Sequence, residues 1–128
     1  MHKSKSTATG NVGESIACIF LERKGFRILA RNYSRPWGEI DVVAIKNNIV
    51  RFVEVKTLTI HDADISREMN SYRPEEQIHQ AKLRKIVRTA QAYMSRGKDA
   101  REFQIDAVGV ILDQRTRIAR CRLYEQVI

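Results

Sequence analysis

Three ionisable residues, Asp41, Glu54 and Lys56, stand inside two otherwise apolar segments of the chain. A carboxylate in such a place is unfavourable unless it is hydrogen-bonded, paired or bound to a metal. Two converging carboxylates can hold a hard divalent cation, and an ammonium beside them can orient a water or balance the charge of a phosphate. These residue types therefore indicate phosphodiester hydrolysis. The structural alternative is a buried ion network, which is a weak source of stability.

A β-hairpin over residues 39–57 is predicted to carry these three groups. Segments 42–45 and 49–55 are rich in β-branched and aromatic residues, which strands favour. The polar break Lys46-Asn47-Asn48 separates them and is typical of a turn. The hairpin is thus the element around which the rest of the chain has to be arranged.

Two further carboxylates are expected near the hairpin. Side chains alternate along a strand, so Glu39 should share a face with Asp41, where it would contact the metal ligands or cap the strand. A helix is predicted over residues 12–24, ended by Gly25, with Glu14 on the inward side of its first turn because apolar residues follow at helical spacing. A stabilising role with the helix dipole is the alternative for Glu14.

The remaining segments predict a single α/β domain. Asp106 is an acidic residue in an apolar strand whose role the sequence does not assign, and an Arg or Lys of a long helix is one candidate partner. The expected segments, in chain order, are a flexible basic tail at 1–10, the helix 12–24, an edge strand at 26–33, the hairpin 39–57, a surface loop at 58–73, the helix 74–96 and two strands at 102–112 and 117–124. The domain should therefore span residues 11–128 in the order α-β-β-β-α-β-β.

Charge and composition favour a polyanionic partner. The 128 residues carry a formal net charge of +8 and a sequence pI near 9.9, which suits nucleic acid. The N-terminus lacks the apolar run of a secretory signal, and no apolar stretch is long enough for a membrane span. Cys18 and Cys121 form no motif with metal-ligand spacing. We therefore expect a cytoplasmic protein with no membrane association.

Other polar residues are weaker candidates, for which a solvated surface role is the alternative. Gln77 and Lys82 lie near the start of the long helix, where it could pass beside the hairpin. Cations and an aromatic residue that could contact nucleic acid are Arg31, Arg35, Tyr72, Arg73 and Lys85.

Several motifs of the chain resemble those of the PD-(D/E)xK, or restriction-endonuclease-like, nuclease superfamily, and more narrowly the YraN-like family of small bacterial proteins. They are the Gly13-Glu14 pair, the run at 38–41, the run at 52–56, the Lys82 helix and the strand at 103–110. One departure is that Ile40 precedes Asp41 where the superfamily's name has proline.

This resemblance implies a mixed β-sheet flanked by helices and a Mg²⁺ or Mn²⁺ site. Asp41 and Glu54, with the Val55 carbonyl, correspond to the metal ligands, and Lys56 to the catalytic lysine. Glu14 corresponds to a first-helix glutamate in relatives similar to archaeal Holliday-junction resolvases, where it binds the metal directly or through water. The implied activity is DNA cleavage, with a preference for branched or flap DNA and a homodimer suited to it. A nucleic-acid-binding module without turnover is the alternative.

Overall fold

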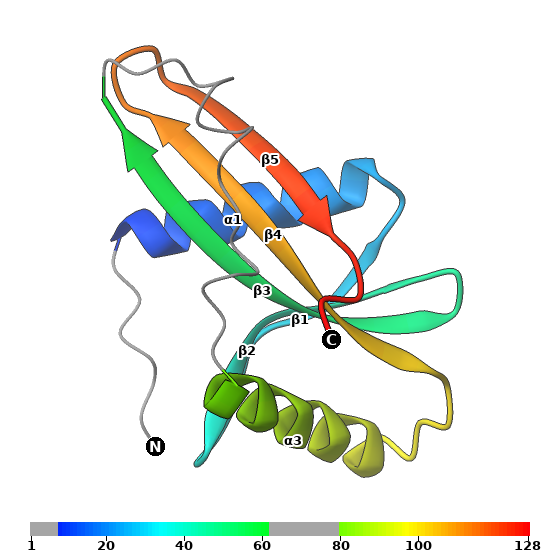
Figure 1. Ribbon diagram of the computed structural model, residues 1–128. Helices are drawn as coiled ribbons and strands as arrows, with labels where there is room; N and C mark the ends of the chain where they lie inside the picture. Colours follow the sequence, from blue (N-terminus) through cyan, green and yellow to red (C-terminus); the bar gives the residue numbers. More distant parts are fainter. Residues whose placement is uncertain (1–7, 62–79) are drawn as a thin grey trace.

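The computed structural model describes residues 8–61 and 80–128. Within these ranges two helices and five strands follow one another in the predicted order, so the α/β class and the arrangement α-β-β-β-α-β-β are confirmed (Figure 1). The elements are α1 (Ala8–Arg23), β1 (Arg27–Arg35), β2 (Gly38–Lys46), β3 (Ile49–Ile60), α3 (Gln80–Arg96), β4 (Phe103–Asp113) and β5 (Ile118–Tyr124).

The five strands form one mixed sheet in the order β1-β2-β3-β4-β5. Neighbouring strands are antiparallel except β3 and β4, which are parallel. A parallel pair needs a crossover connection, and this one contains α3. β1 lies at one edge of the sheet, as predicted, and β5 lies at the other.

The β2–β3 hairpin follows from its turn residues. Lys46 pairs with Ile49, so the loop contains only Asn47 and Asn48, and both have positive φ values, 54° and 61°. Two successive left-handed residues are typical of a type I′ turn, and Asn tolerates this conformation better than most residues. The predicted hairpin is therefore confirmed.

β3 is longer than the sequence predicts. Residues 58–60 were expected to begin a surface loop, which is wrong, because they continue the ladder with β4 as far as the pair Ile60–Asp113. The parallel partner satisfies their backbone groups, and nothing in the local sequence reveals such a distant partner. Residues 62–73 of the expected loop, and residues 74–79 of the expected long helix, lie outside the described residues.

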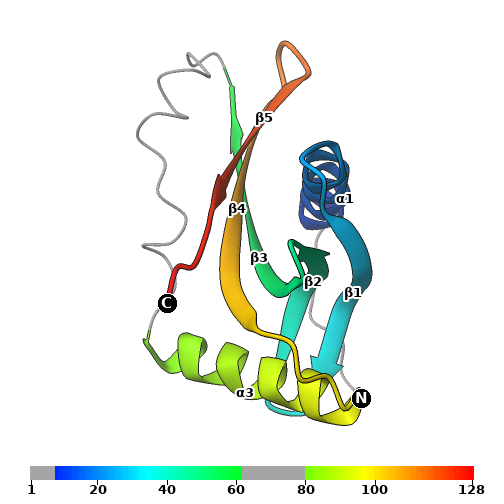
Figure 2. The same cartoon turned by 90° about the vertical axis from the view of Figure 1, so that its right-hand side faces the viewer.

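The two helices pack on opposite faces of the sheet. Phe52 of β3 packs in a cluster with Ile86 and Ala90 of α3, whereas its neighbour Val53 packs in a cluster with Leu21 of α1. Adjacent strand residues point to opposite faces, so the core has two layers, one under each helix. Figure 2 shows α1 and α3 on different sides of the sheet and toward different ends of it.

α1 begins at Ala8, earlier than predicted, so residues 8–10 of the expected tail are helical and residues 1–7 lie outside the described residues. Gly25, with a φ of 94°, ends the helix as predicted, since glycine adopts the left-handed conformation without strain. The early start makes Glu14 the seventh residue of α1. The expectation that Glu14 lies in the first turn is therefore wrong, and the helix dipole does not explain it.

Asp106 pairs with a different element from the candidate one. Its carboxylate lies 3.2 Å from Arg51 Nη1 and accepts hydrogen bonds from Gln104 Nε2 and the Gln126 N–H, both at 2.8 Å. Arg51 also contacts Glu125 at 2.8 Å. The candidate pairing with the long helix is wrong, because β3 and β4 are direct neighbours, and the network instead holds the C-terminal segment against the sheet.

No helix within residues 8–61 or 80–128 is both long enough and apolar enough to cross a membrane.

Candidate metal centre at the divergence of β2 and β3

Asp41 and Glu54 lie where β2 and β3 separate. The β2–β3 ladder ends at the pair Val42–Val53, so Asp41 and Glu54 are the first residues beyond it. β3 continues alongside β4, whereas β2 turns away. This divergence opens the end of the ladder, where side chains from both faces of the sheet can approach the same place.

Asp41 closes the open end of the ladder. Its Oδ2 accepts a hydrogen bond from the Val55 N–H at 2.8 Å, in place of the strand partner that this backbone group has lost. The bond fixes Asp41 against β3, beside Glu54. Ile40 and Val43 both pack in the cluster under α3, so the strict two-residue alternation of β2 is interrupted around Asp41.

The Asp41 and Glu54 carboxyl groups repel each other when both are ionised. The pKa of Asp41 is raised to about 9, first by burial and then by the charge of Glu54 and a hydrogen bond with its side chain. The Val55 N–H opposes this shift because it favours the carboxylate. Asp41 therefore favours its protonated form at neutral pH. A cation between the two carboxyl groups would offset their repulsion and lower the pKa of Asp41.

Two lysines adjoin this pair from β3 and α3. Lys82 Nζ lies 2.9 Å from Glu54 Oε2, and the Glu54 side chain is only 5% exposed. Burial opposes the charge of Lys82, but Glu54 more than offsets it, so the pKa of Lys82 is raised. The pKa of Lys56 is lowered, first by burial and then by the hydrogen bond and charge of Lys82. Lys56 thus loses its proton more readily than an ordinary lysine.

Glu14 reaches this region from the face covered by α1. It is 7% exposed, and its Oε1 lies 3.7 Å from Arg31 Nη2, an ion pair without a hydrogen bond. Burial raises the pKa of Glu14, and the Arg31 charge opposes the rise. Oε1 is buried with no hydrogen-bond partner among the described residues, so Glu14 has unused capacity to accept a water or a cation.

A close contact between α1 and β3 sets the position of Glu14. The neighbouring residue, Gly13, packs against the Thr57 side chain so closely that a Cβ added at Gly13 would overlap Thr57 Oγ1. Only glycine allows this approach. The Gly13-Glu14 pair therefore combines a packing residue with a carboxylate that the packing directs toward the divergence.

The donor set suits a hard divalent cation only in part. No three His, Cys, Asp or Glu side chains within residues 8–61 and 80–128 lie close enough together to form a metal-binding group. Asp41 and Glu54, with the Val55 carbonyl, are the residues that could hold Mg²⁺ or Mn²⁺ directly, and oxygen ligands are those these ions prefer. Glu14, with its unpartnered Oε1, is suited to bind through water.

The other candidate residues are distributed as follows. Glu39 accepts a 3.3 Å hydrogen bond from Ser34 Oγ and borders a cavity that Lys82 and Lys85 also line. Arg35 stacks on Tyr33 with 4.6 Å from its guanidinium carbon to the ring centroid, and Arg31 is paired with Glu14. The candidates Tyr72, Arg73 and Gln77 lie outside the described residues.

Sequence reasoning missed two features. Lys82 was expected only to lie near the candidate metal ligands, yet it forms an ion pair with one of these residues, Glu54. Trp37, in the link between β1 and β2, was given no role, although it lines the same cavity as Glu39. Its position between Pro36 and Gly38 predicts a turn but does not predict which residues the indole contacts.

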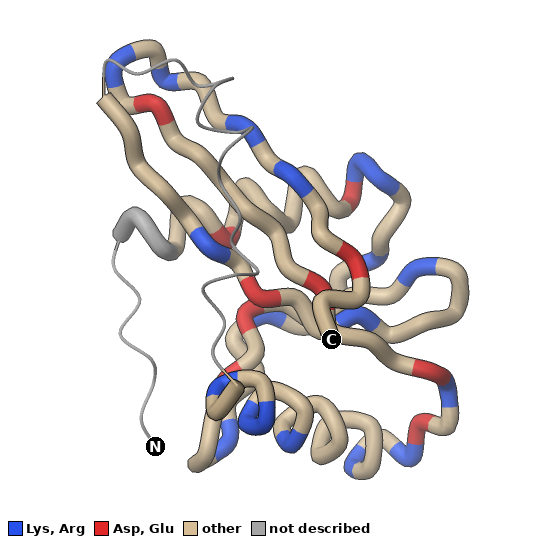
Figure 3. Tube along the Cα trace, viewed as in Figure 1, with Lys and Arg blue, Asp and Glu red and all other residues tan. Residues whose placement is uncertain are grey.

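Positive charge borders the divergence. In Figure 3, Lys and Arg positions recur along α3 and β5, whereas Asp and Glu positions gather near the place where β2 and β3 separate. Cations around an acidic centre would attract a phosphate backbone.

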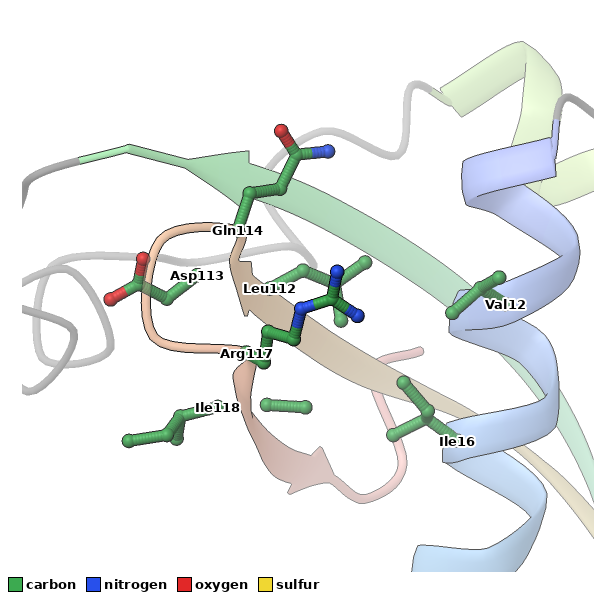
Figure 4. Close-up of a pocket in the computed structure, with 8 residues that line it drawn as sticks. Val12, Ile16, Leu112, Asp113, Gln114, Arg117 and Ile118 are labelled. Atoms are coloured by element: carbon green, nitrogen blue, oxygen red, sulfur yellow. The ribbon is translucent and has the colours of Figure 1, made fainter.

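A second cavity, of about 490 Å³, lies between α1 and the β4–β5 turn. Figure 4 shows Val12 and Ile16 of α1 on one side and Arg117 and Leu112 on the other. Among the described residues that line it, the only carboxylate is that of Asp113, which already accepts hydrogen bonds from the backbone of the turn that follows β4. This described lining does not contain the residue types needed for phosphodiester chemistry.

Comparison with known proteins assigns the chain to a protein family. A model described as "Uncharacterised protein family UPF0102" matches residues 13–110, the span that contains the Asp41–Glu54 pair. A UPF0102 protein of Campylobacter jejuni is 36% identical over 104 residues, which cover 81% of this chain and 84% of the relative. UPF0102 proteins of Chloroherpeton thalassium (36% over 118 residues, 89% and 83%) and Caldanaerobacter subterraneus (39% over 95 residues, 74% and 71%) are also similar. The predicted YraN-like membership is thus confirmed, and the chain belongs to the uncharacterised protein family UPF0102.

Proposed function

We propose that this protein is a divalent-metal-dependent endonuclease that hydrolyses DNA phosphodiesters. The observation that carries the proposal is the Asp41–Glu54 pair at the end of the β2–β3 ladder, with Lys56 beside it. Two carboxylates forced together and a lysine with a lowered pKa are the groups that metal-assisted hydrolysis requires, and strongly perturbed groups tend to mark functional sites.

Each side chain has a distinct part in this reaction. Asp41, Glu54 and the Val55 carbonyl would hold Mg²⁺ or Mn²⁺, which would stabilise the negative charge that develops on the phosphate. Lys56 Nζ orients the attacking water and accepts its proton, which its lowered pKa favours. Glu14 Oε1 holds a water at the edge of the site. Lys82 limits the net charge around Glu54 and helps to lower the pKa of Lys56.

Substrate affinity would come mainly from the protein's net charge of +8. Lys and Arg contacts to phosphates are independent of sequence and weaken as salt rises. A preference for branched or flap DNA rests on the resemblance to junction resolvases. A homodimer would suit a two-fold junction, and light scattering at several protein concentrations would measure it.

A nucleic-acid-binding module without turnover is the second candidate. The 2.9 Å ion pair between Lys82 and Glu54 favours it, because the lysine neutralises a carboxylate that the metal would need. In that case Lys82 would stand permanently in place of the cation and the site would be structural.

One experiment separates the two functions. Purified protein is incubated with labelled single-stranded, duplex, flap and four-way-junction DNA in Mg²⁺, Mn²⁺ or EDTA. Metal-dependent cleavage that is lost in Asp41→Asn and Lys56→Ala, and kept in the control Asp99→Asn, whose carboxylate pairs with Arg101 away from the candidate centre, supports the endonuclease. Binding without cleavage on every substrate and with either metal would replace it by the binding module.

A further inference from the structure

The cavity beside the candidate metal centre has its own chemistry. It has a volume of about 460 Å³, within the range of about 300–1,000 Å³ that is typical of small-molecule sites. Trp37, Gly38 and Glu39 line it from the β1–β2 link and the start of β2, and Lys82 and Lys85 line it from the first turns of α3. Lys82 also contacts Glu54, so the cavity and the metal centre share a residue.

Trp37 gives the cavity an aromatic wall. The Arg88 guanidinium lies 3.9 Å from the centroid of its ring and does not line the cavity, so Arg88 holds the indole in place from outside. Trp37 Nε1 is buried and has no hydrogen-bond partner among the described residues. Because this donor is buried, a ligand in the cavity would contact the indole through its ring surface and not through Nε1.

The polar residues around this wall match a nucleotide. Lys82 and Lys85 present two cations that would contact phosphates, and Lys82 also contacts Glu54 of the metal centre. Glu39 presents a carboxylate, which can accept hydrogen bonds from the amino group of a base. The aromatic wall, the cations and the acceptor thus correspond to the stacking face, the phosphate and the edge of one nucleotide.

We propose that this cavity binds one unpaired nucleobase of the DNA strand, next to the phosphate at the Asp41–Glu54 pair. The inference rests on the proposed function, and it adds the substrate class. A base inside a duplex is stacked and paired and cannot enter, so the substrate has at least one unpaired nucleotide, as in a single strand, a flap or the branch of a junction.

The sole tryptophan of the chain is Trp37, so its fluorescence reports on this cavity alone. The intact protein is titrated in EDTA, which prevents cleavage, with a short single-stranded oligonucleotide, the blunt duplex of the same sequence, and an abasic strand with the same phosphates. We expect saturable quenching by the single strand only. Quenching of equal size by the abasic strand, or unchanged emission while anisotropy shows that the single strand binds, would overturn the proposal, as would failure of the single strand to bind.

Variants separate the base from the phosphate. Trp37→Ala should weaken single-strand binding, measured by anisotropy of a labelled strand, roughly tenfold or more, as expected when one stacked base is lost. Lys85→Ala should weaken binding more than Arg84→Ala, which removes the same charge from the same helix at an exposed position outside the cavity. Equal losses for the two charge variants, or full affinity in a folded Trp37→Ala, would contradict the cavity's role.

Cleavage is measured separately in Mg²⁺, so the two proposals can fail independently. Base-dependent quenching without cleavage on any substrate would keep the nucleobase site and remove the nuclease. Cleavage without base-dependent quenching would keep the nuclease and remove the nucleobase site.

Discussion

Lys82 Nζ of α3 lies 2.9 Å from Glu54 Oε2 of β3, beyond the last pair of the β2–β3 ladder. The contact joins two elements that the crossover connection brings together, and it places a cation against a carboxylate that is almost fully buried. Lys82 also contributes to the lowered pKa of Lys56. One α3 residue thereby affects both a proposed metal ligand and the proposed proton acceptor.

Replacing Lys82 by alanine should raise the pKa of Lys56. Burial, the largest cause of the lowered pKa, would remain, but the hydrogen bond and charge of Lys82 would be lost. Lys56 would then be protonated up to a higher pH, so the acidic limb of the pH–rate profile for DNA cleavage should move to higher pH. Lys82→Arg keeps the charge and should move the limb less. An acidic limb in the same place for wild type and Lys82→Ala would contradict this coupling.

The same substitution should also destabilise the fold. It removes the cation beside a buried carboxylate, although Lys82 itself is 42% exposed and solvent screens the pair. The loss should therefore lie between that of an exposed and a buried ion pair, about 1–2 kcal/mol in the free energy of unfolding. Urea denaturation at pH 7 measures it, with Arg84→Ala as the charge-matched control on the same helix.

Asp41 should make stability fall as pH rises. Its pKa is raised to about 9, so folding favours the protonated form. The stability it contributes is fully present below its unfolded pKa near 3.8 and is lost progressively as pH rises toward 9, with a slope of at most about 1.4 kcal/mol per pH unit. Asp41→Asn stays neutral, and its carbonyl can still accept the Val55 N–H.

We therefore expect the melting temperature of wild type, in EDTA, to decrease between pH 5 and pH 9 more steeply than that of Asp41→Asn. Asp99→Asn is a control because the pKa of Asp99 is shifted in the opposite direction from that of Asp41. Hydrogen bonds from Arg101 lower the pKa of Asp99 to about 2, so its contribution is present above its ordinary pKa and is lost only as pH falls through about 2. Parallel melting curves for wild type and Asp41→Asn across this range would show that Asp41 is not held protonated.

The elements of the fold could be predicted from the sequence because each has a local signal. The Asn47-Asn48 turn and the β-branched runs around it define the hairpin, and Gly25 ends α1. The end of β3 could not be predicted, because the pairing of residues 58–60 depends on β4, more than forty positions away. The start of α1 was also missed, since small residues such as those at 8–10 have no apolar period.

The candidate site was predictable to the extent that it consists of charges in apolar strands. Asp41, Glu54 and Lys56 were chosen on this ground, and the structure brings the first two together at the end of the ladder. The Lys82–Glu54 contact and the Trp37 cavity were not predictable, because both depend on where α3 crosses β2 and β3. Periodicity predicts which face of α3 is apolar, and the crossing position requires the assembled sheet.

Mg²⁺ should stabilise the wild-type protein and leave Glu54→Gln unchanged. A ligand bound only by the folded state adds about 2.7 kcal/mol at a concentration one hundred times its Kd. Because Asp41 must release its proton, the rise in melting temperature should be larger at pH 8 than at pH 6. Thermal unfolding in Mg²⁺ against EDTA measures both effects, with Asp99→Asn as the carboxylate control. A similar rise in wild type and Glu54→Gln would mean that Mg²⁺ binds elsewhere.

Gly13→Ala should displace α1 from β3 and lower stability by about 1–3 kcal/mol, as expected for overpacking. The added Cβ would overlap Thr57 Oγ1 and lie 3.1 Å from Thr57 Cβ. Thr57→Ala removes the hydroxyl and the methyl group, so the double variant Gly13→Ala/Thr57→Ala should regain most of the stability that Gly13→Ala loses. Urea denaturation of the four proteins gives the coupling energy between the two positions.

The same double-mutant cycle tests the role of Glu14, because Gly13 positions it. If the α1–β3 contact places Glu14 at the metal centre, cleavage in Mg²⁺ should fall in Gly13→Ala and recover in the double variant together with stability. Lys24→Ala, at the other end of α1 from this contact, provides the comparison. Additive stability losses at positions 13 and 57 would mean that the close contact does not set the position of α1.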